Sequence, residues 1–247
     1  MSFFERLDLL LGTSAASALA DARVAVFGVG GVGGWCAESL VRSGVRRIAI
    51  VDSDVVRPSN VNRQVMATAH TVGQAKVHAM RDRLLSINPN AEISAFERVY
   101  DGESSASFEL GGYDYVIDAI DSVRDKAHLI NHVTRLDRPV LFSSMGAACK
   151  TDPFRIRKSE FWKVCGDGLA RALRMRFRKS GEFPAKKFTC VWSDEVVPNK
   201  GRAVEPDEEN PFRKVRVNGT VAHVTAAFGF ALAGLVVNDV CASRGNP

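Results

Sequence analysis

The sequence lacks paired cysteines. Its five cysteines are scattered over 247 residues, form no Cys-x-x-Cys pair, and are odd in number. We therefore expect neither a disulfide framework nor a structural zinc site, and free thiols are typical of a reducing cytosol. The N-terminal segment MSFFERLDLLLG mixes acids with apolar residues and precedes no small-residue cleavage site, so a secretory signal is not expected.

The sequence also lacks internal repeats and low-complexity segments. Apolar residues make up 46% of the chain and charged residues 25%, a balance typical of a protein with a sizeable core. This composition excludes a disordered chain, a collagen-like repeat and a disulfide-stapled miniprotein. A length of 247 residues suits one large domain or one domain with an appended region.

Residues 23–144 alternate short apolar runs with amphipathic segments. We expect strands over 23–31, 46–54, 91–99, 113–121 and 138–144, and helices over 32–44, 73–89 and 122–137. Apolar strands separated by amphipathic helices are typical of a parallel sheet covered on both faces. The sequence therefore predicts an α/β fold with a Rossmann-like, doubly wound and mainly parallel sheet.

The pattern changes after residue 147. We expect a strand over 154–162, a basic helix over 168–179, a polar loop over 193–214 and an apolar helix over 218–240. The apolar helix reaches the lower limit of a membrane span, but its small residues, two threonines and His223 favour burial against the sheet or a subunit partner. The chain thus divides into residues 1–147 and a C-terminal extension, residues 148–247, packed on them as one structural unit.

Positive charge is concentrated in this extension. Residues 150–187 hold twelve lysines and arginines against four acids, a local charge of +8 in a total of +5, so the rest carries −3. On a helix, Arg171, Arg174, Arg178 and Lys179 would form a mostly continuous positive stripe. Such a stripe suits an RNA backbone, because phosphate neutralisation supplies affinity without reading sequence. The alternative is an ordinary solvated helix face.

A glycine-rich turn joins the first predicted strand to the first helix. Gly28, Gly30, Gly31 and Gly33 stand where glycine lets the backbone approach a phosphate and a helix N-terminus offers free N–H groups. Asp52 follows nineteen residues after Gly33, the distance at which a carboxylate reaches a ribose hydroxyl. The turn and the carboxylate together predict a nucleotide site.

The residues beyond that carboxylate argue against a simple NAD site. A second acid and a cluster of polar and cationic side chains follow it: Asp54, Asn60, Arg63, Gln64 and Lys76. Cations placed there suit a polyphosphate whose charge must be neutralised. Asp121 ends the fourth strand at the same edge of the sheet, and one carboxylate with phosphate oxygens is how Mg²⁺ is normally held. The sequence therefore predicts an MgATP site.

The segments GVGGVG, DSDVV, SNVNRQ, VGQAK, INP and DAIDS resemble those of the ubiquitin-activating-enzyme-like superfamily, whose members MoeB, ThiF and HesA adenylate a carboxylate. The likeness covers residues 4–145. It implies that Gly31 and Asp52 contact ATP, and that Arg63 and Lys76 stabilise charge at the α-phosphate. It also implies that Asp121 positions Mg²⁺.

Further expectations follow from the same resemblance. Asp54, Asn60 and Gln64 fall inside the matching ATP-binding motifs. Ser122 belongs to this set as a departure, because many relatives have asparagine directly after the preceding aspartate. Arg6 lines up with an arginine that these homodimers insert into the neighbouring subunit's ATP site.

Within the superfamily, the sequence resembles the tRNA threonylcarbamoyladenosine dehydratases. The likeness rests on DAIDSVRDK, CKTDPFRI, DGLARALRMRFRK, FTCVWSDE and GTVAHVTAAFGFALAG, and on the missing Cys-x-x-Cys pairs of MoeB and ThiF; it runs over residues 4–240. It implies a cytoplasmic enzyme that cyclises threonylcarbamoyladenosine beside the anticodon of a tRNA. The threonine carboxylate is adenylated by ATP, and the urea oxygen of the same side chain then closes a ring and expels AMP.

Two other functions stay open at this point. An enzyme that adenylates the C-terminal glycine of a small ubiquitin-like sulfur-carrier protein would use the same ATP site without needing the basic segment. An NAD-binding module would leave the cations unexplained. Cys190 is either a small buried residue or a reactive thiol, and a cysteine-desulfurase or sulfur-acceptor partner stays open with it. The tRNA reaction needs no catalytic cysteine, because its nucleophile is already tethered.

Overall fold

The computed structural model describes residues 3–200 and 218–243. Within these residues a seven-stranded sheet has the order β3-β2-β1-β4-β5-β7-β6. Every neighbouring pair is parallel except β6 and β7, which are antiparallel. The predicted Rossmann-like, doubly wound and mainly parallel sheet is therefore confirmed. The strands are β1 (Arg23–Phe27), β2 (Arg47–Val51), β3 (Glu92–Phe96), β4 (Tyr115–Asp118), β5 (Val140–Ser144), β6 (Ile156–Glu160) and β7 (Thr189–Ser193).

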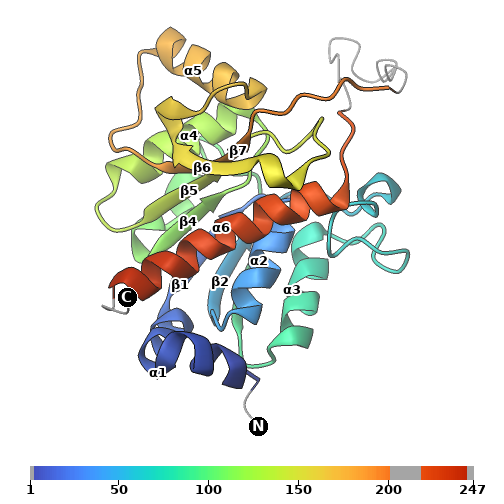
Figure 1. The fold of residues 1–247 in the computed structure, drawn as a ribbon, viewed down its shortest axis with the longest axis vertical. Coiled ribbons are helices and arrows are strands. Elements are labelled where there is room, and N and C mark those ends of the chain that lie inside the picture. Colours follow the sequence, from blue (N-terminus) through green and yellow to red (C-terminus); the bar gives the residue numbers. More distant parts are fainter. Residues whose placement is uncertain (1–2, 201–217, 244–247) are drawn as a thin grey trace.

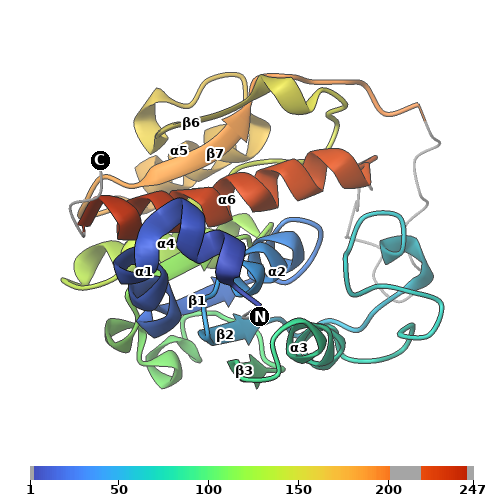
Figure 2. The same ribbon diagram turned by 60° about the horizontal axis from the view of Figure 1, so that its bottom comes forward.

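Helices cover both faces of this sheet (Figures 1 and 2). One face carries α2, α3 and α6, with α1 at its end, and the other carries α4 and α5. The helices are α1 (Glu5–Asp21), α2 (Gly33–Arg42), α3 (Lys76–Ile87), α4 (Val123–Arg135), α5 (Gly168–Ser180) and α6 (Ala222–Ser243). Short 3₁₀ turns occupy several connections, namely η1 (Pro58–Asn60), η2 (Ser105–Phe108), η3 (Leu110–Gly112), η4 (Pro153–Arg155) and η5 (Phe161–Lys163).

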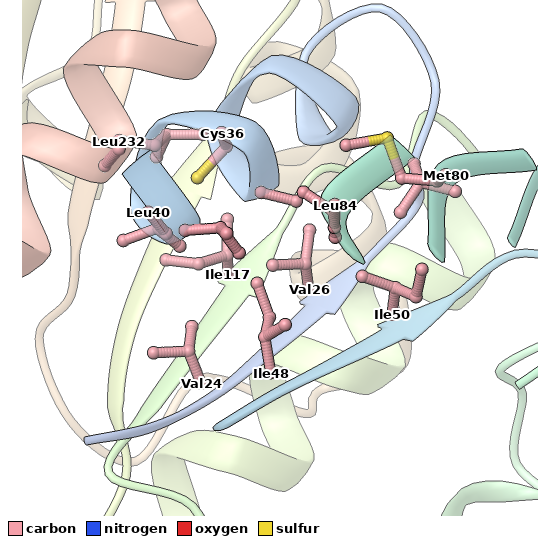
Figure 3. Packing of buried hydrophobic residues seen from close by; sticks show 14 of the residues in the cluster. Val24, Val26, Cys36, Leu40, Ile48, Ile50, Met80, Leu84, Ile117 and Leu232 are labelled. Atoms are coloured by element: carbon pink, nitrogen blue, oxygen red, sulfur yellow. The ribbon is translucent and has the colours of Figure 1, made fainter. Parts of the chain in front are cut away.

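The two faces of each central strand feed two separate cores. On β1, Val24 and Val26 point toward α2 and α3, where they meet Leu40 and Leu84 (Figure 3). The alternate residue Phe27 belongs to the core under α4 and α5. Both cores are built from fully buried aliphatic and aromatic side chains, whose removal from water is the main stabilising term of such a sheet.

The C-terminal extension completes the sheet rather than forming a second one. β7 pairs with β5 in parallel, and β6 adds the antiparallel edge. α6 then returns across the sheet and packs on α2 (Figure 1). At Gly229 a Cβ atom would lie 2.6 Å from the Val32 carbonyl oxygen, so only glycine lets the two helices approach so closely.

α6 is also long and apolar enough to cross a membrane by length and composition alone. More than half of its apolar window, 56%, is nevertheless buried inside the protein. The packing on α2 and the sheet accounts for this apolar composition, as expected for a helix buried in a protein core. This agrees with our prediction of burial against the sheet.

The structure differs from the sequence expectations in detail. No element was predicted over residues 5–21, where the structure has α1; its helical backbone is interrupted at Gly12, which has a φ of 78°. The helix expected from residue 73 begins only at Lys76. Ser193, expected to start the polar loop, ends β7 instead. Residues 201–214 of that loop lie outside the described residues.

Candidate active site

A cleft of about 1560 Å³ opens at the carboxyl edge of the sheet. Its walls come from the segments that follow β1, β2, β4, β5 and β7, and from the beginnings of α3, α5 and α6. Ligands of doubly wound sheets bind at this edge. We call the lining between Phe27 and Asp125 the glycine-turn half, and the lining between Ser144 and Val196 the α5 half.

The glycine-rich turn forms the floor of the glycine-turn half. Gly28 adopts a left-handed φ of 83°, and a Cβ atom on Gly33 would lie 1.8 Å from the Gly28 carbonyl oxygen. These two positions therefore require glycine for the turn itself. Gly30 and Gly31 line the cleft together with Gly28, whereas Gly33 is buried and does not line it. Any effect of Gly33 on a ligand is thus through the shape of the turn.

Asp52 directly follows β2 and lies beside this turn. Its Oδ2 accepts a hydrogen bond from the Val29 N–H at 2.9 Å, and its Oδ1 accepts one from the Asp54 N–H at 2.9 Å. Burial raises the pKa of the Asp52 carboxyl above its usual range, opposed by the Lys76 ammonium and by these two N–H groups. The carboxylate is therefore fixed in place while still lining the cleft.

Lys76 opens α3 and is almost fully buried. Its Nζ lies 2.7 Å from Asp54 Oδ2 and 3.9 Å from Asp52 Oδ1. The side chain of Lys76 is 8% exposed, so its charge is weakly screened by solvent. Two carboxylates therefore hold one poorly solvated cation at the wall of the cleft.

The SNVNRQ segment supplies the next wall. Asn60 is buried and accepts a hydrogen bond from the Arg57 N–H, which closes the η1 turn. Gln64 is also buried, and its Oε1 has no hydrogen-bond partner among residues 3–200 and 218–243. A buried polar atom without a partner is costly, and here it lines the cleft. This favours a polar ligand beside Gln64.

Arg63 lies between the glycine turn and Asp121. Its Cγ is 3.5 Å from the position that a Cβ would take on Gly31, and its Nη1 donates to the Ser59 carbonyl at 2.8 Å. Trp35 Nε1 donates to the Arg63 carbonyl at 3.0 Å and fixes the backbone. Burial lowers the pKa of the Arg63 guanidinium, and the Asp121 carboxylate opposes this shift.

Asp121 and Ser122 follow β4 and line the cleft, but their side chains make different contacts. Ser122 is the N-cap of α4: its Oγ accepts from the Asp125 N–H and donates to Asp125 Oδ2 at 2.8 Å. The Asp121 carboxylate is exposed and has no hydrogen-bond partner within the described part of the chain. Asp121 is thus the carboxylate of this half that is free to take a ligand, while Ser122 lines the cleft with its hydroxyl engaged.

A buried ion pair under the Asp121 loop was missed by sequence reasoning. Lys126 Nζ lies 2.9 Å from Asp118 Oδ2, and both side chains are fully buried. The same Nζ donates to the Ile120 carbonyl at 3.0 Å, and Ser143 Oγ donates to Asp118 Oδ2 at 2.7 Å. Burial raises the pKa of the Asp118 carboxyl, opposed by the Lys126 ammonium and then by the hydrogen bond from Ser143. The pair fixes the backbone that leads to Asp121.

The α5 half is lined by smaller side chains. Asp167, the N-cap of α5, accepts from the Ala170 N–H at 2.8 Å and the Gly146 N–H at 3.1 Å. Lys150 is buried, and its Nζ donates to the carbonyls of Ser193 and Glu195. Both charged groups therefore serve the fold of this wall. Small residues leave open space between them, namely Gly146, Ala147, Ala148, Gly166, Gly168 and Ala172.

The predicted basic stripe on α5 divides into two kinds of arginine. Arg171 lines the cleft and is exposed, and its side chain makes no hydrogen bond or ion pair among the described residues. Arg178 and Lys179 are likewise exposed further along the helix. Arg174 instead donates from Nη1 to the Val164 carbonyl at 2.9 Å and lies over the Phe161 ring. Its guanidinium is thus committed to the η5 turn, which separates it from the other three.

Two further predicted residues lie away from the cleft. Arg6 is exposed on α1 and is absent from the lining of the cleft. Its neighbour Leu7 packs against Gly44, at the amino edge of the sheet, whereas the cleft lies at the carboxyl edge. Cys190 is fully buried in β7, and burial raises the pKa of its thiol. This location agrees with a packing role for Cys190.

Comparison with known proteins fits this arrangement. The chain matches the ThiF family over residues 5–244. The tRNA threonylcarbamoyladenosine dehydratase of Bacillus subtilis is 40% identical over 241 residues, which cover 96% of this chain and 94% of that relative. The crystal structure of the E. coli tRNA N6-threonylcarbamoyladenosine dehydratase TcdA in complex with ATP is similar with a TM-score of 0.85 at 33% identity, covering 98% of this chain and 94% of that chain.

A more distant relative matches only part of the chain. The molybdopterin-synthase adenylyltransferase of Salmonella typhimurium is 39% identical over 106 residues, which are 43% of this chain and 42% of that relative. The B. subtilis and E. coli dehydratases, in contrast, match along nearly the whole length of both chains, including the region that builds the α5 half. The chain therefore belongs to the ThiF family and, within it, to the tRNA threonylcarbamoyladenosine dehydratases.

Proposed function

We propose that this chain uses ATP to cyclise threonylcarbamoyladenosine in tRNA, with net loss of water from the nucleoside. The observation that carries the proposal is that one continuous cleft joins a glycine turn lined by Lys76, Arg63 and Asp121 to the α5 half. A reaction between a nucleotide and a second substrate needs such adjoining spaces. The likeness to TcdA, whose crystal structure is a complex with ATP, supports placing ATP in the glycine-turn half.

The residues of the glycine-turn half fit a triphosphate. Gly30 and Gly31 bring free backbone close to the cleft, and Gln64 offers a buried polar group without a partner. Asp52 is placed for a ribose hydroxyl. Arg63 and Lys76 supply positive charge where an α-phosphate gains charge during nucleophilic attack. We assign ATP binding to this half on these grounds.

The main requirement of the reaction is that the enzyme positions the threonine carboxylate against the α-phosphate of ATP. The threonine carboxylate attacks the α-phosphate and pyrophosphate leaves, which turns a poor hydroxide leaving group into AMP. The urea oxygen of the same side chain attacks the activated carbonyl, AMP departs as the ring closes, and a urea N–H proton is released to solvent. Because nucleophile and electrophile belong to one side chain, an effective molarity of about 10⁵ M or more is available without a covalent enzyme intermediate.

We place the modified nucleoside in the α5 half. The small residues there leave space for a base, and Arg171 sits at the rim as a cation without a partner in the described chain. Arg178 and Lys179 extend the positive surface along α5 away from the cleft. This positive surface suits the phosphates of a tRNA. Since the substrate is a tRNA, we also propose a cytoplasmic location.

Mg²⁺ is proposed at Asp121. A free carboxylate on the cleft wall, together with phosphate oxygens, is a usual ligand set for this ion. Bound there, Mg²⁺ would neutralise charge on the phosphates. Asp121→Asn should therefore raise the Mg²⁺ concentration needed for half-maximal turnover. An unchanged metal titration would shift the assignment to Asp54, whose side chain is 62% exposed.

A homodimer completed by Arg6 is the remaining structural proposal. Arg6 lies at the amino edge of the sheet and cannot serve its own cleft, while Leu9 and Leu10 beside it are 81% and 80% exposed and suit a subunit contact. Mixing an Arg6→Ala subunit with a Lys76→Ala subunit should restore one of the two sites in a mixed dimer. If mixed dimers form and no activity returns, Arg6 does not act across the interface.

The decisive experiment is mass spectrometry of nucleosides from tRNA that carries threonylcarbamoyladenosine. Incubation with the protein and MgATP should convert this nucleoside to a product lighter by one water, and omission of ATP should prevent the conversion. If the nucleoside survives intact with folded, ATP-binding protein, the proposal is wrong.

A pyrophosphate-exchange assay distinguishes the alternative function, adenylation of a sulfur-carrier protein. Adenylation of a sulfur-carrier protein would show as pyrophosphate exchange that depends on a small protein with a C-terminal glycine and not on tRNA. The partial match to the molybdopterin-synthase adenylyltransferase supports only the shared nucleotide chemistry. A desulfurase or sulfur-acceptor partner would be tested in the same way, by its effect on that exchange.

A further inference from the structure

Asn62 lies between the Arg63 side chain and the segment that leads into α6. Its Oδ1 accepts a hydrogen bond from Arg63 Nη1 at 3.1 Å, and its Nδ2 donates to the Thr220 carbonyl at 3.1 Å. A carbonyl oxygen can only accept, so the Thr220 contact fixes Nδ2 on its own side and turns Oδ1 toward Arg63. One amide thus connects the C-terminal region to a cation of the cleft.

The hydrogen bonds of Arg63 are confined to one end of its guanidinium. Nη1 donates to Asn62 and to the Ser59 carbonyl, whereas Nε and Nη2 have no hydrogen-bond partner within residues 3–200 and 218–243. Arg63 lines the cleft, so these two groups remain for a ligand. The Nη1 contacts therefore set the direction in which the free donors point.

The far end of the link is itself anchored. The Gly219 N–H donates to Asn199 Oδ1 at 2.8 Å, and the Cys149 N–H donates to the Gly219 carbonyl at 2.9 Å. Further along, the Thr225 side chain lies 3.3 Å from the position of a Cβ on Gly31. The 218–225 segment is therefore held by the α5 half on one side and by the glycine turn on the other.

We propose that Asn62 is a positioning residue that orients Arg63 toward the α-phosphate, and that the 218–225 segment is thereby part of the adenylation site. The inference rests on the proposed function, since it takes Arg63 to act at the α-phosphate. Without Asn62 the guanidinium loses one restraint and spends less time in the productive direction. ATP binding draws on the whole triphosphate, so turnover falls more than ATP affinity does.

A double-mutant cycle tests the link to Arg63. Asn62→Ala, Arg63→Ala and the double variant are compared by steady-state conversion of threonylcarbamoyladenosine tRNA. Asn62→Ala should lower kcat by about 10- to 100-fold with the KM for ATP changed by less than about 3-fold. In the Arg63→Ala background the same change should cost less than about 2-fold. An equal loss in both backgrounds would overturn the proposal, because Asn62 would then act independently of Arg63.

Asn62→Asp tests the link to the C-terminal segment. The carboxylate keeps an oxygen for Arg63 but has no hydrogen to donate to the Thr220 carbonyl. We expect kcat to fall at least about 5-fold, and an unchanged kcat would remove the 218–225 segment from the site. Asn238→Ala, at an exposed asparagine of α6, is the matched control. If the wild-type protein itself does not convert the nucleoside, the proposed function fails; if it converts and the cycle shows no coupling, only the role of Asn62 fails.

Discussion

The two halves of the cleft are built in different ways. In the glycine-turn half charged side chains are already paired with one another before any ligand arrives: Lys76 Nζ lies 2.7 Å from Asp54 Oδ2 and 3.9 Å from Asp52 Oδ1. In the α5 half, by contrast, the buried charges Asp167 and Lys150 bond to backbone groups and hold the wall in shape. The glycine-turn half is thus a fixed arrangement of charged side chains, whereas the α5 half is an open space with a wall held in shape by buried charges.

The difference matches what each half is proposed to hold. A triphosphate presents the same charges in every turnover, so cations fixed in advance avoid reorganisation at the moment of reaction. A nucleoside that arrives attached to a large RNA gains its affinity outside the cleft, along the phosphate backbone. The space that receives it needs small residues and a few directing groups rather than a dense set of ions.

The largest effect is expected in the glycine-turn half. Lys76→Ala should lower turnover by about 100- to 1000-fold, because a cation aimed at charge that develops in the transition state is lost. ATP affinity, measured by equilibrium binding, should change by less than about 10-fold, since the glycine turn and Arg63 remain. Turnover and binding are compared in the same buffer.

The control for Lys76 lies on the same helix. Within the described part of the chain, Arg81 of α3 pairs only with the neighbouring Asp82, and it does not line the cleft. Arg81→Ala should leave both turnover and ATP binding within about 2-fold of the wild type. Near-normal turnover in Lys76→Ala would instead mean that the fixed cation is a structural partner of Asp54 and nothing more, and the contrast between the halves would lose its basis.

Sequence reasoning predicted the glycine-turn half better than the α5 half. The turn after β1 and Asp52 after β2 could be predicted because each follows a strand whose apolar run marks the sheet edge. Arg63 and Lys76 could be predicted because they belong to the local motifs SNVNRQ and VGQAK in the connection from β2 to the start of α3. Lys126 could not be predicted as buried, because its surroundings come from distant segments. Ser143 of β5 donates to the same Asp118 carboxylate that pairs with Lys126.

The α5 stripe shows the same limit. Spacing alone groups Arg174 with Arg171 and Arg178, since all three fall within one side of the helix. The η5 turn, which precedes α5 in the chain, folds under the helix and places the Phe161 ring and two carbonyl groups beside Arg174. The spacing of residues on a helix does not predict which other segment packs against each side chain. Gly33 is a similar case, because the turn folds it below the cleft.

The next effect tests the α5 half. Replacing Arg171 and Arg178 together by alanine should weaken tRNA binding and lower the slope of log affinity against log salt by about one to two units, with ATP binding unchanged. Filter binding at several salt concentrations measures both quantities. If neither affinity nor slope moves, the exposed arginines are an ordinary solvated face.

Arg174 provides the comparison within the same helix. Arg174→Ala should lower the free energy of unfolding by about 1–3 kcal/mol, because the carbonyls of Phe161 and Val164 lose a charged donor. In the Arg174→Ala variant, the slope of log tRNA affinity against log salt should stay near that of the wild type. A lower salt slope with unchanged stability would place Arg174 among the phosphate contacts and contradict the division of the stripe.

The smallest effect concerns a histidine pair behind the glycine-turn half. Tyr100 lines the cleft, and its hydroxyl lies 2.9 Å from His132 Nδ1 and 3.2 Å from His128 Nδ1. Burial, and then the neighbouring His128, lower the pKa of His132. Near pH 6.5 the imidazole of His132 therefore binds a proton more readily in the unfolded chain than in the folded protein. The free energy of unfolding falls as the pH drops below about 6.5 toward the lowered pKa.

His132→Gln should reduce the slope of the unfolding free energy against pH, between pH 7 and 5, by up to about 1.4 kcal/mol per pH unit, measured by urea denaturation. His70→Gln, at an exposed histidine, should leave the slope as it is. If the two variants behave alike, the glycine-turn half does not rest on an uncharged histidine, and its organisation stops at the residues that line the cleft.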